Sequence, residues 1–75
     1  MQKTKITLRD VKSVREFVQK VIVLDFEVDL EQDRYIVDAK SIMGIFALDT
    51  LSPIDVVAHT DDASAFFETI KEFIV

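Results

Sequence analysis

Residues 38–48 of this 75-residue chain read DAKSIMGIFAL, in which a serine precedes five large apolar side chains within seven positions. Serine is a preferred helix N-cap, because its side-chain oxygen accepts a hydrogen bond from an otherwise unpaired backbone amide. The loop residues Asp49-Thr50 and Ser52-Pro53 follow. The stretch therefore predicts a helix of about two turns that starts after Ser41. So short a helix cannot bury all five apolar side chains, so we expect some of them to be exposed.

A β-hairpin is predicted immediately before this helix. Apolar and polar residues alternate over residues 26–30 and again over residues 35–39, which is the period of a half-buried strand. The polar turn Glu31-Gln32-Asp33-Arg34 separates the two runs.

A strand and a helix are predicted after the short helix. Residues 54–59 alternate again, with Val57 and His59 on the face opposite Ile54. Thr60-Asp61-Asp62 then offers capping oxygens and negative charge at the start of a last helix. We expect that helix to bury these residues: Ala63, Phe66 or Phe67, Ile70, and Phe73 or Ile74.

The N-terminal part of the chain predicts one further strand and one further helix. Residues 3–8 alternate, with Ile6 and Leu8 on one face. A helical apolar stripe follows, and Ser13 with Glu16 forms a plausible capping box, so a helix is predicted to begin between Asp10 and Ser13 and to end near Val23. The stripe comprises Val11, Val14, Phe17, Val18, Val21 and Ile22.

The resulting order β-α-β-β-α-β-α predicts an α+β fold, a largely antiparallel sheet with all helices on one face. The other face should meet water. Carboxylates alternate with core residues along this face and are best explained as a solvated surface, because their spacing forms neither an acid–base pair nor a metal-ligand set. They are Asp25, Glu27, Asp29, Glu31 and Asp33.

Composition narrows the classes of function. Residues 1–75 suit a single domain, and 49% hydrophobic residues argue against disorder. The net charge of −5 disfavours nucleic acid and anionic membrane surfaces, which leaves a protein as the expected partner. There is no cysteine, no zinc or phosphate-loop motif and no stretch of transmembrane length. We therefore expect a cytoplasmic protein without metal or cofactor and without a large enclosed pocket.

Residues 38–48 resemble the helix-opening serine motif of HPr, the histidine phosphocarrier of the bacterial sugar phosphotransferase system. The similarity continues from about Asp25 to the C-terminus, and before Asp25 it rests mainly on position and pattern. It implies an HPr-like open-faced β-sandwich: a four-stranded antiparallel sheet of order 1-4-2-3 with three helices on one side. The whole chain would then be one HPr-like domain.

The junction before the first helix departs from this family. Family members carry phosphate on a histidine in a Gly-(Ile/Leu)-His-Ala-Arg-Pro-Ala segment, whereas residues 8–14 here read LRDVKSV. Asp10 and Val11 stand where the carrier histidine is lost. Two replacement acceptors are conceivable: an acyl phosphate on Asp10, or His59, the only histidine. The topology places His59 on the solvent face, at the end of the sheet far from the carrier site.

The resemblance assigns a second role to Ser41, because a kinase phosphorylates the serine of this motif in Gram-positive members. It also implies that the outer face of the helix, with Lys40, Ile42, Met43 and Phe46, contacts partners, while Ile45 and Leu48 join the core. The leading hypothesis is a noncatalytic HPr-like regulator, not an enzyme. Its expected partners are an HPr kinase and phosphotransferase or catabolite-control components. The alternatives are a phosphocarrier using His59 or Asp10 and a structural module that self-associates through the apolar helix.

Overall fold

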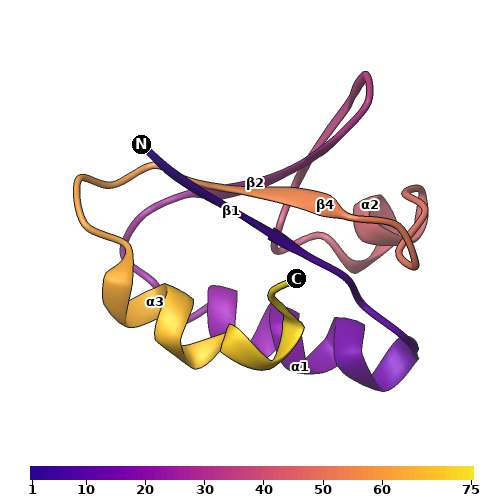
Figure 1. Ribbon diagram of the computed structural model, residues 1–75, viewed down its shortest axis with the longest axis horizontal. Coiled ribbons are helices and arrows are strands. Elements are labelled where there is room, and N and C mark those ends of the chain that lie inside the picture. Colours follow the sequence, from indigo (N-terminus) through magenta and orange to yellow (C-terminus); the bar gives the residue numbers. More distant parts are fainter.

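Four strands form one antiparallel sheet in the order β1-β4-β2-β3 in a computed structural model that describes residues 1–75. The strands are β1 (Gln2–Ile6), β2 (Val28–Gln32), β3 (Tyr35–Asp38) and β4 (Ile54–Ala58). The predicted open-faced fold and its strand order are confirmed. Figure 1 shows the long helix α1 (Val11–Val21) and α3 (Ser64–Thr69) lying side by side beneath the sheet. The short helix α2 (Ile42–Phe46) lies beyond the end of the sheet at which β4 begins.

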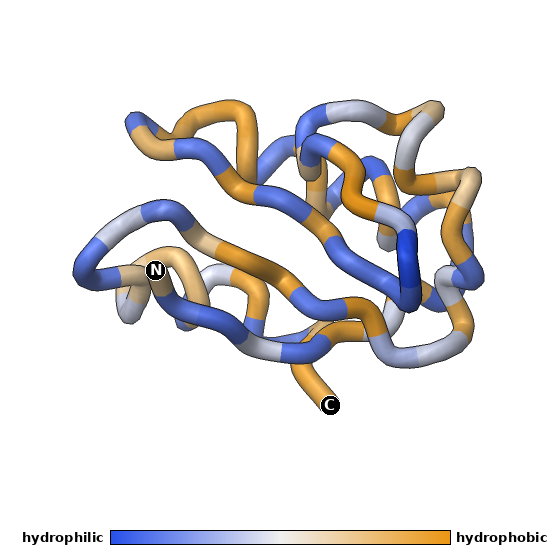
Figure 2. Tube along the Cα trace, turned by 90° about the horizontal axis from the view of Figure 1, so that it is seen from above, coloured by the Kyte–Doolittle hydropathy of each residue, from blue (hydrophilic) through white to orange (hydrophobic).

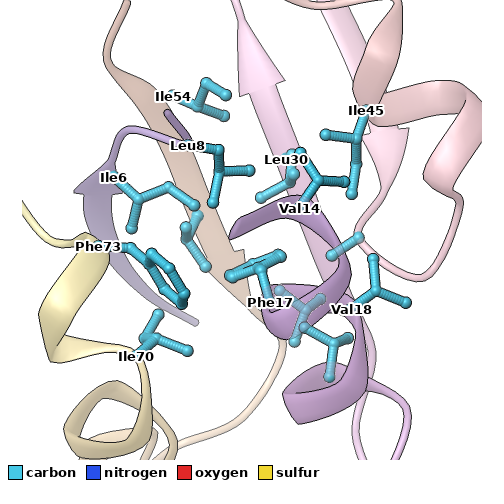
Figure 3. Packing of buried hydrophobic residues seen from close by; sticks show 14 of the residues in the cluster. Ile6, Leu8, Val14, Phe17, Val18, Leu30, Ile45, Ile54, Ile70 and Phe73 are labelled. Atoms are coloured by element: carbon cyan, nitrogen blue, oxygen red, sulfur yellow. The ribbon is translucent and has the colours of Figure 1, made fainter. Parts of the chain in front are cut away.

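The core lies between the sheet and the helices and contains eighteen buried hydrophobic residues. Phe17 of α1 is fully buried at its centre, and its ring meets Phe73 edge-to-face with centroids 6.2 Å apart. In Figure 3 the side chains of Ile6 and Leu30 extend from the strands toward this ring. Of the alternatives that the sequence left open, Phe66 and Phe73 are the buried ones.

The face of the sheet without helices carries mostly polar side chains, visible in Figure 2 as the alternation of blue and orange along the strands. An ion pair between Lys5 and Asp55 at 2.7 Å lies on it, as does a contact of 2.8 Å between the His59 imidazole and the Asp29 carboxylate. Val57 also faces this side and yet is 1% exposed. It lies on the central strand β4, in register with Lys3 on one side and Asp29 on the other, so its polar neighbours cover it.

Helix α1 begins within the predicted range, between Asp10 and Ser13, but its capping and its end differ from the prediction. The expected Ser13–Glu16 capping box is wrong, because the N-cap is Asp10, whose carboxylate accepts a hydrogen bond from the Ser13 amide at 2.8 Å. A carboxylate three residues earlier satisfies that amide, so Ser13 lies inside the helix. The helix ends at Val21, and Val11 and Ile22 are exposed although both belong to the apolar stripe.

The C-terminal part is a short helix followed by a 3-10 turn, η1 (Lys71–Phe73), where one helix was predicted. Its N-cap residue is Ala63, which cannot cap, but the Asp62 carboxylate accepts hydrogen bonds from the amide and hydroxyl of Ser64. These bonds lower the pKa of Asp62 below its ordinary value. No helix has the length and apolar character needed to cross a membrane.

Candidate functional site

Ser41 is the N-cap of α2, as the sequence predicts. Its backbone is extended, and its hydroxyl oxygen accepts a hydrogen bond from the Gly44 amide at 3.0 Å. Gly44 lets the helix approach β3 closely, because a Cβ at this position would lie 3.1 Å from the Cβ of Val37. Ile45 is fully buried and Leu48 is nearly so, in agreement with the prediction. The cap and the close contact with β3 therefore determine how α2 is oriented.

The outer side of α2 is exposed and apolar. Met43 is 82% exposed, and Ile42 and Phe46 are also exposed, so the three predicted contact residues form a surface that we call the α2 face. Residues 42–46 of this helix include no charged side chain. Exposed apolar residues grouped on one element commonly mark protein interfaces.

Two further large apolar residues, Leu51 and Val11, are exposed in the loop after α2 and at the start of α1. Val11 was named from the sequence as a position of the lost carrier histidine, whereas Leu51 was not singled out. The loop that carries Leu51 is fixed by the Gln32 side-chain amide, which makes two 2.8 Å hydrogen bonds to the backbone of Asp49. The Leu8 amide donates to the Thr50 carbonyl at 2.9 Å, and this bond joins the same loop to the segment before α1. The only feature of the sequence that could have indicated an exposed Leu51 is its position as a single leucine between polar loop residues.

Lys40 lies one residue before the cap, and its ammonium group is held by acidic neighbours. Its Nζ lies 2.6 Å from a carboxylate oxygen of Glu27 and 3.7 Å from one of Asp38. The hydrogen bond to Glu27, helped by the charge of Asp38, raises the pKa of Lys40 above its ordinary value. Lys40 therefore remains charged, and the carboxylates of Glu27 and Asp38 neutralise much of its positive charge.

Asp10 lies at the start of α1, at the position of the lost carrier histidine. The Ser13 amide and hydroxyl both stabilise its carboxylate, and they lower its pKa below the ordinary value of 3.8. A more stable carboxylate is a weaker base and a weaker nucleophile. A shallow depression of 320 Å³ lies beside this junction, and Arg9, Ser13 and Glu72 are among its lining residues.

We expect Asp10→Ala to lower the thermal unfolding midpoint at neutral pH, because the variant loses the cap of α1. Since the folded-state pKa of Asp10 is lowered, its stabilising effect is present above pH 3.8 and disappears as the pH falls through the folded-state pKa. The difference in midpoint between the two proteins should therefore vanish in acid. Unfolding followed by circular dichroism across this range, with Asp61→Ala as control, measures it. A difference that persists unchanged in acid would contradict a charged cap.

His59 lies at the opposite end of the molecule from Asp10. Residue 58, its neighbour, pairs with Gln2 at the beginning of β1, whereas α1 begins after the other end of that strand. The imidazole Nε2 lies 2.8 Å from the Asp29 carboxylate. The structure therefore brings the Asp10 junction and the α2 face together and leaves His59 apart, as the sequence predicts. No group of three or more His, Asp or Glu side chains is placed to hold a metal ion.

A family model described as the PTS HPr component phosphorylation site matches residues 10–75. Among solved structures, HPr-C-His from Thermoanaerobacter tengcongensis is 24% identical, with a TM-score of 0.80 over 96% of this chain and 89% of that chain. Phosphocarrier protein HPr from Bacillus anthracis is 25% identical, with a TM-score of 0.75 over 99% of this chain and 96% of that chain. No curated protein matches the sequence.

The catabolite repression protein Crh from Bacillus subtilis is 28% identical. Its TM-score is 0.67, over 93% of this chain and 87% of that chain. Its crystal structure is described as a dimer with a swapped domain.

Proposed function

Because the chain belongs to the family of HPr components of the phosphotransferase system, we propose that it is a regulatory docking protein of that system. In this proposal it does not carry phosphate between enzymes. The observation that carries the proposal is a combination of two neighbouring features. A capped serine opens an exposed apolar helix, and the adjoining junction, residues 8–14, contains no histidine. The first feature favours recognition, and the second opposes phosphate carriage.

The chemistry of Ser41 supports a regulatory modification. Its oxygen accepts the Gly44 amide, so its hydroxyl proton is free to leave when a kinase transfers the γ-phosphoryl group of ATP to this oxygen and releases ADP. The resulting phosphate would lie at the N-terminal end of α2, one residue after the cation Lys40. Amides at a helix start and a nearby cation both favour a phosphate, so we expect the modification to leave the fold intact.

The loss of carrier chemistry is supported by the surroundings of each replacement acceptor. Asp10 caps α1 with a stabilised carboxylate, and His59 lies beside the Asp29 carboxylate at the far end of the sheet, where this negative charge would repel a phosphate. A phosphocarrier needs a reactive nucleophile beside groups that stabilise the phosphate. Neither residue combines those two properties.

Incubation with ATP and an HPr kinase, followed by intact mass and peptide mass spectrometry, tests the proposal. We expect one added phosphate on Ser41, its loss in Ser41→Ala and its retention in Ser52→Ala, the matched serine in the following loop. Loss of the cap in Ser41→Ala should cost about 1 kcal/mol, so circular dichroism must show that the variant is folded.

Two results would contradict the proposal. In the first, Ser41 stays unmodified and immobilised protein retains neither phosphotransferase nor catabolite-control components, which removes the link to that system. In the second, phosphoenolpyruvate and enzyme I transfer an acid-labile phosphate to the protein. That label would show that the chain still acts as a carrier.

A further inference from the structure

One edge strand of the sheet is covered by another part of the chain, and the other edge strand is not. The outer side of β1 is covered by the end of the chain: the Thr7 amide donates to the Phe73 carbonyl and the Val75 amide donates to the Lys5 carbonyl, each at 3.0 Å. No segment pairs with the outer side of β3, the other edge. In Figure 1 the turn end of the β2–β3 hairpin projects clear of the helices. An open edge presents unpaired backbone groups to any strand that can approach.

The pairing of β3 with β2 determines which backbone groups remain free. Val37 pairs with Leu30, and the Ala39 amide donates to the Val28 carbonyl at 3.0 Å. Hydrogen-bonding direction alternates along an antiparallel strand, so residues 35, 37 and 39 direct their amides and carbonyls toward β2. Ile36 therefore directs its amide and carbonyl outward. A strand added at this edge must form its bonds through Ile36.

The side chains at the centre of β3 are uncharged, and the strand contains no lysine, proline or bulge. Natural edge strands commonly carry a lysine, a proline or a bulge. Residues 35–37 read Tyr-Ile-Val, with Tyr35 60% exposed and Ile36 66% exposed. Aromatic and β-branched residues of this kind are those that stabilise cross-strand pairs.

We propose that β3 pairs antiparallel with β3 of a second copy of this chain, about a two-fold axis at Ile36, and forms a continuous eight-stranded sheet. In this register Ile36 lies opposite Ile36, and Tyr35 lies opposite the partner's Val37. Arg34 lies opposite the partner's Asp38, and the same pair recurs on the other side of the axis. The segment Arg34-Tyr35-Ile36-Val37-Asp38 thus complements itself in charge and in shape.

Other registers are less suitable. Arg34, Ile36 and Asp38 are the residues whose backbone groups point outward, so every antiparallel register forms its hydrogen bonds through them. Arg34 belongs to the tight turn beside Asp33, whose backbone has a φ of 54°. The Asp38 carbonyl already accepts the Ser41 amide at 2.9 Å. An axis at Ile36 is the only one that forms its central pair of hydrogen bonds between two Ile36 residues, without using the backbone groups of Arg34 or Asp38.

The dimer should be weak. One short strand buries less area than the roughly 1,000 Å² typical of stable complexes, and two chains of net charge −5 repel each other. Exposed ion pairs add little affinity, so the role of Arg34 and Asp38 is mainly to select the register and the partner. We expect dimers at protein concentrations of about 0.1–1 mM.

Sedimentation equilibrium of the full chain tests the pairing. Arg34→Glu and Asp38→Lys should each weaken self-association about tenfold, because each places like charges opposite each other twice. An equimolar mixture of the two variants should restore association, since both pairs then become complementary. Arg15→Glu on α1 makes the same change in net charge as Arg34→Glu and should leave association unchanged. Ile36→Lys, at an exposed position that does not threaten folding, should abolish it.

Three results would overturn the proposal. The first is a wild-type protein that remains monomeric at 1 mM. The second is association that Phe46→Asp abolishes and Ile36→Lys does not, which would place the contact on the α2 face. The third is a dimer that exchanges subunits over hours and survives every β3 variant, the behaviour of an intertwined, swapped dimer. The proposal does not depend on the regulatory role of Ser41, so the two can fail separately.

Discussion

Phe17→Ala is expected to destabilise the protein by about 3–5 kcal/mol, which is most of the stability available to a domain of this size. Phe17 is fully buried, and its ring packs edge-to-face on Phe73, so truncation removes the contact between α1 and the C-terminal segment and leaves a cavity. Urea unfolding followed by circular dichroism measures the loss. At 37 °C we expect the variant to be largely unfolded.

Two matched variants isolate the effect of burial in this prediction. Phe46→Ala makes the same chemical change at a side chain that is 47% exposed, and should cost less than about 1 kcal/mol. Phe17→Leu keeps most of the volume and should cost less than about 1.5 kcal/mol. Equal losses for Phe17→Ala and Phe46→Ala would mean that Phe17 does not anchor the core.

Hydrophobic periodicity was sufficient to predict the elements and most of the core. The alternation over residues 54–58 and the stripe around Phe17 each depend only on which face of a strand or helix is covered, and this information is local. The order of the strands required the resemblance to a known family, because alternation does not specify which strands are neighbours. Leu30 and Ile6, for example, have the same pattern but lie on different strands.

The predictions failed where cross-strand or cross-loop neighbours decide the outcome. Val57 follows the alternation and faces the polar side, but Lys3 and Asp29 lie in register on both sides of it and cover it. A Ser13–Glu16 capping box was expected within the predicted start region of α1, but Asp10 caps the helix instead, because its carboxylate accepts a hydrogen bond from the Ser13 amide. The burial of Val57 depends on neighbouring strands, and the choice of cap depends on which nearby side chain reaches the amide. A pattern of residue types along the chain does not contain this information.

In the candidate site, too, features that depend on local sequence were predicted, and a feature that depends on a distant contact was not. Ser41, Ile45 and the exposed α2 face follow from a short helix with too many apolar residues to bury. Leu51 escaped prediction because the position of its loop depends on the side-chain amide of Gln32, which holds the Asp49 backbone by two hydrogen bonds. Gln32 is 17 residues from the loop backbone that it contacts, so no local pattern connects them.

Met43→Asp is expected to weaken binding of a phosphotransferase or catabolite-control partner at least tenfold, equivalent to about 1.4 kcal/mol or more. The proposed interface is apolar, and Met43, 82% exposed, is its most accessible member. A carboxylate there would have to lose its hydration on docking without gaining a partner. Folding should be unaffected, because an acidic side chain in the first turn of a helix is favourable.

Val23→Asp is the matched control for this prediction. Val23 is 79% exposed, almost as much as Met43, but it follows α1 at the other end of that helix from Asp10. Calorimetric titration of both variants against purified HPr kinase, enzyme I and a catabolite-control component compares a general effect of charge with a local one. Because both changes add one negative charge to an exposed apolar position, a general effect would weaken both equally. Loss of binding in Met43→Asp alone would assign docking to the α2 face, whereas loss in Val23→Asp alone would move the interface to the far end of α1.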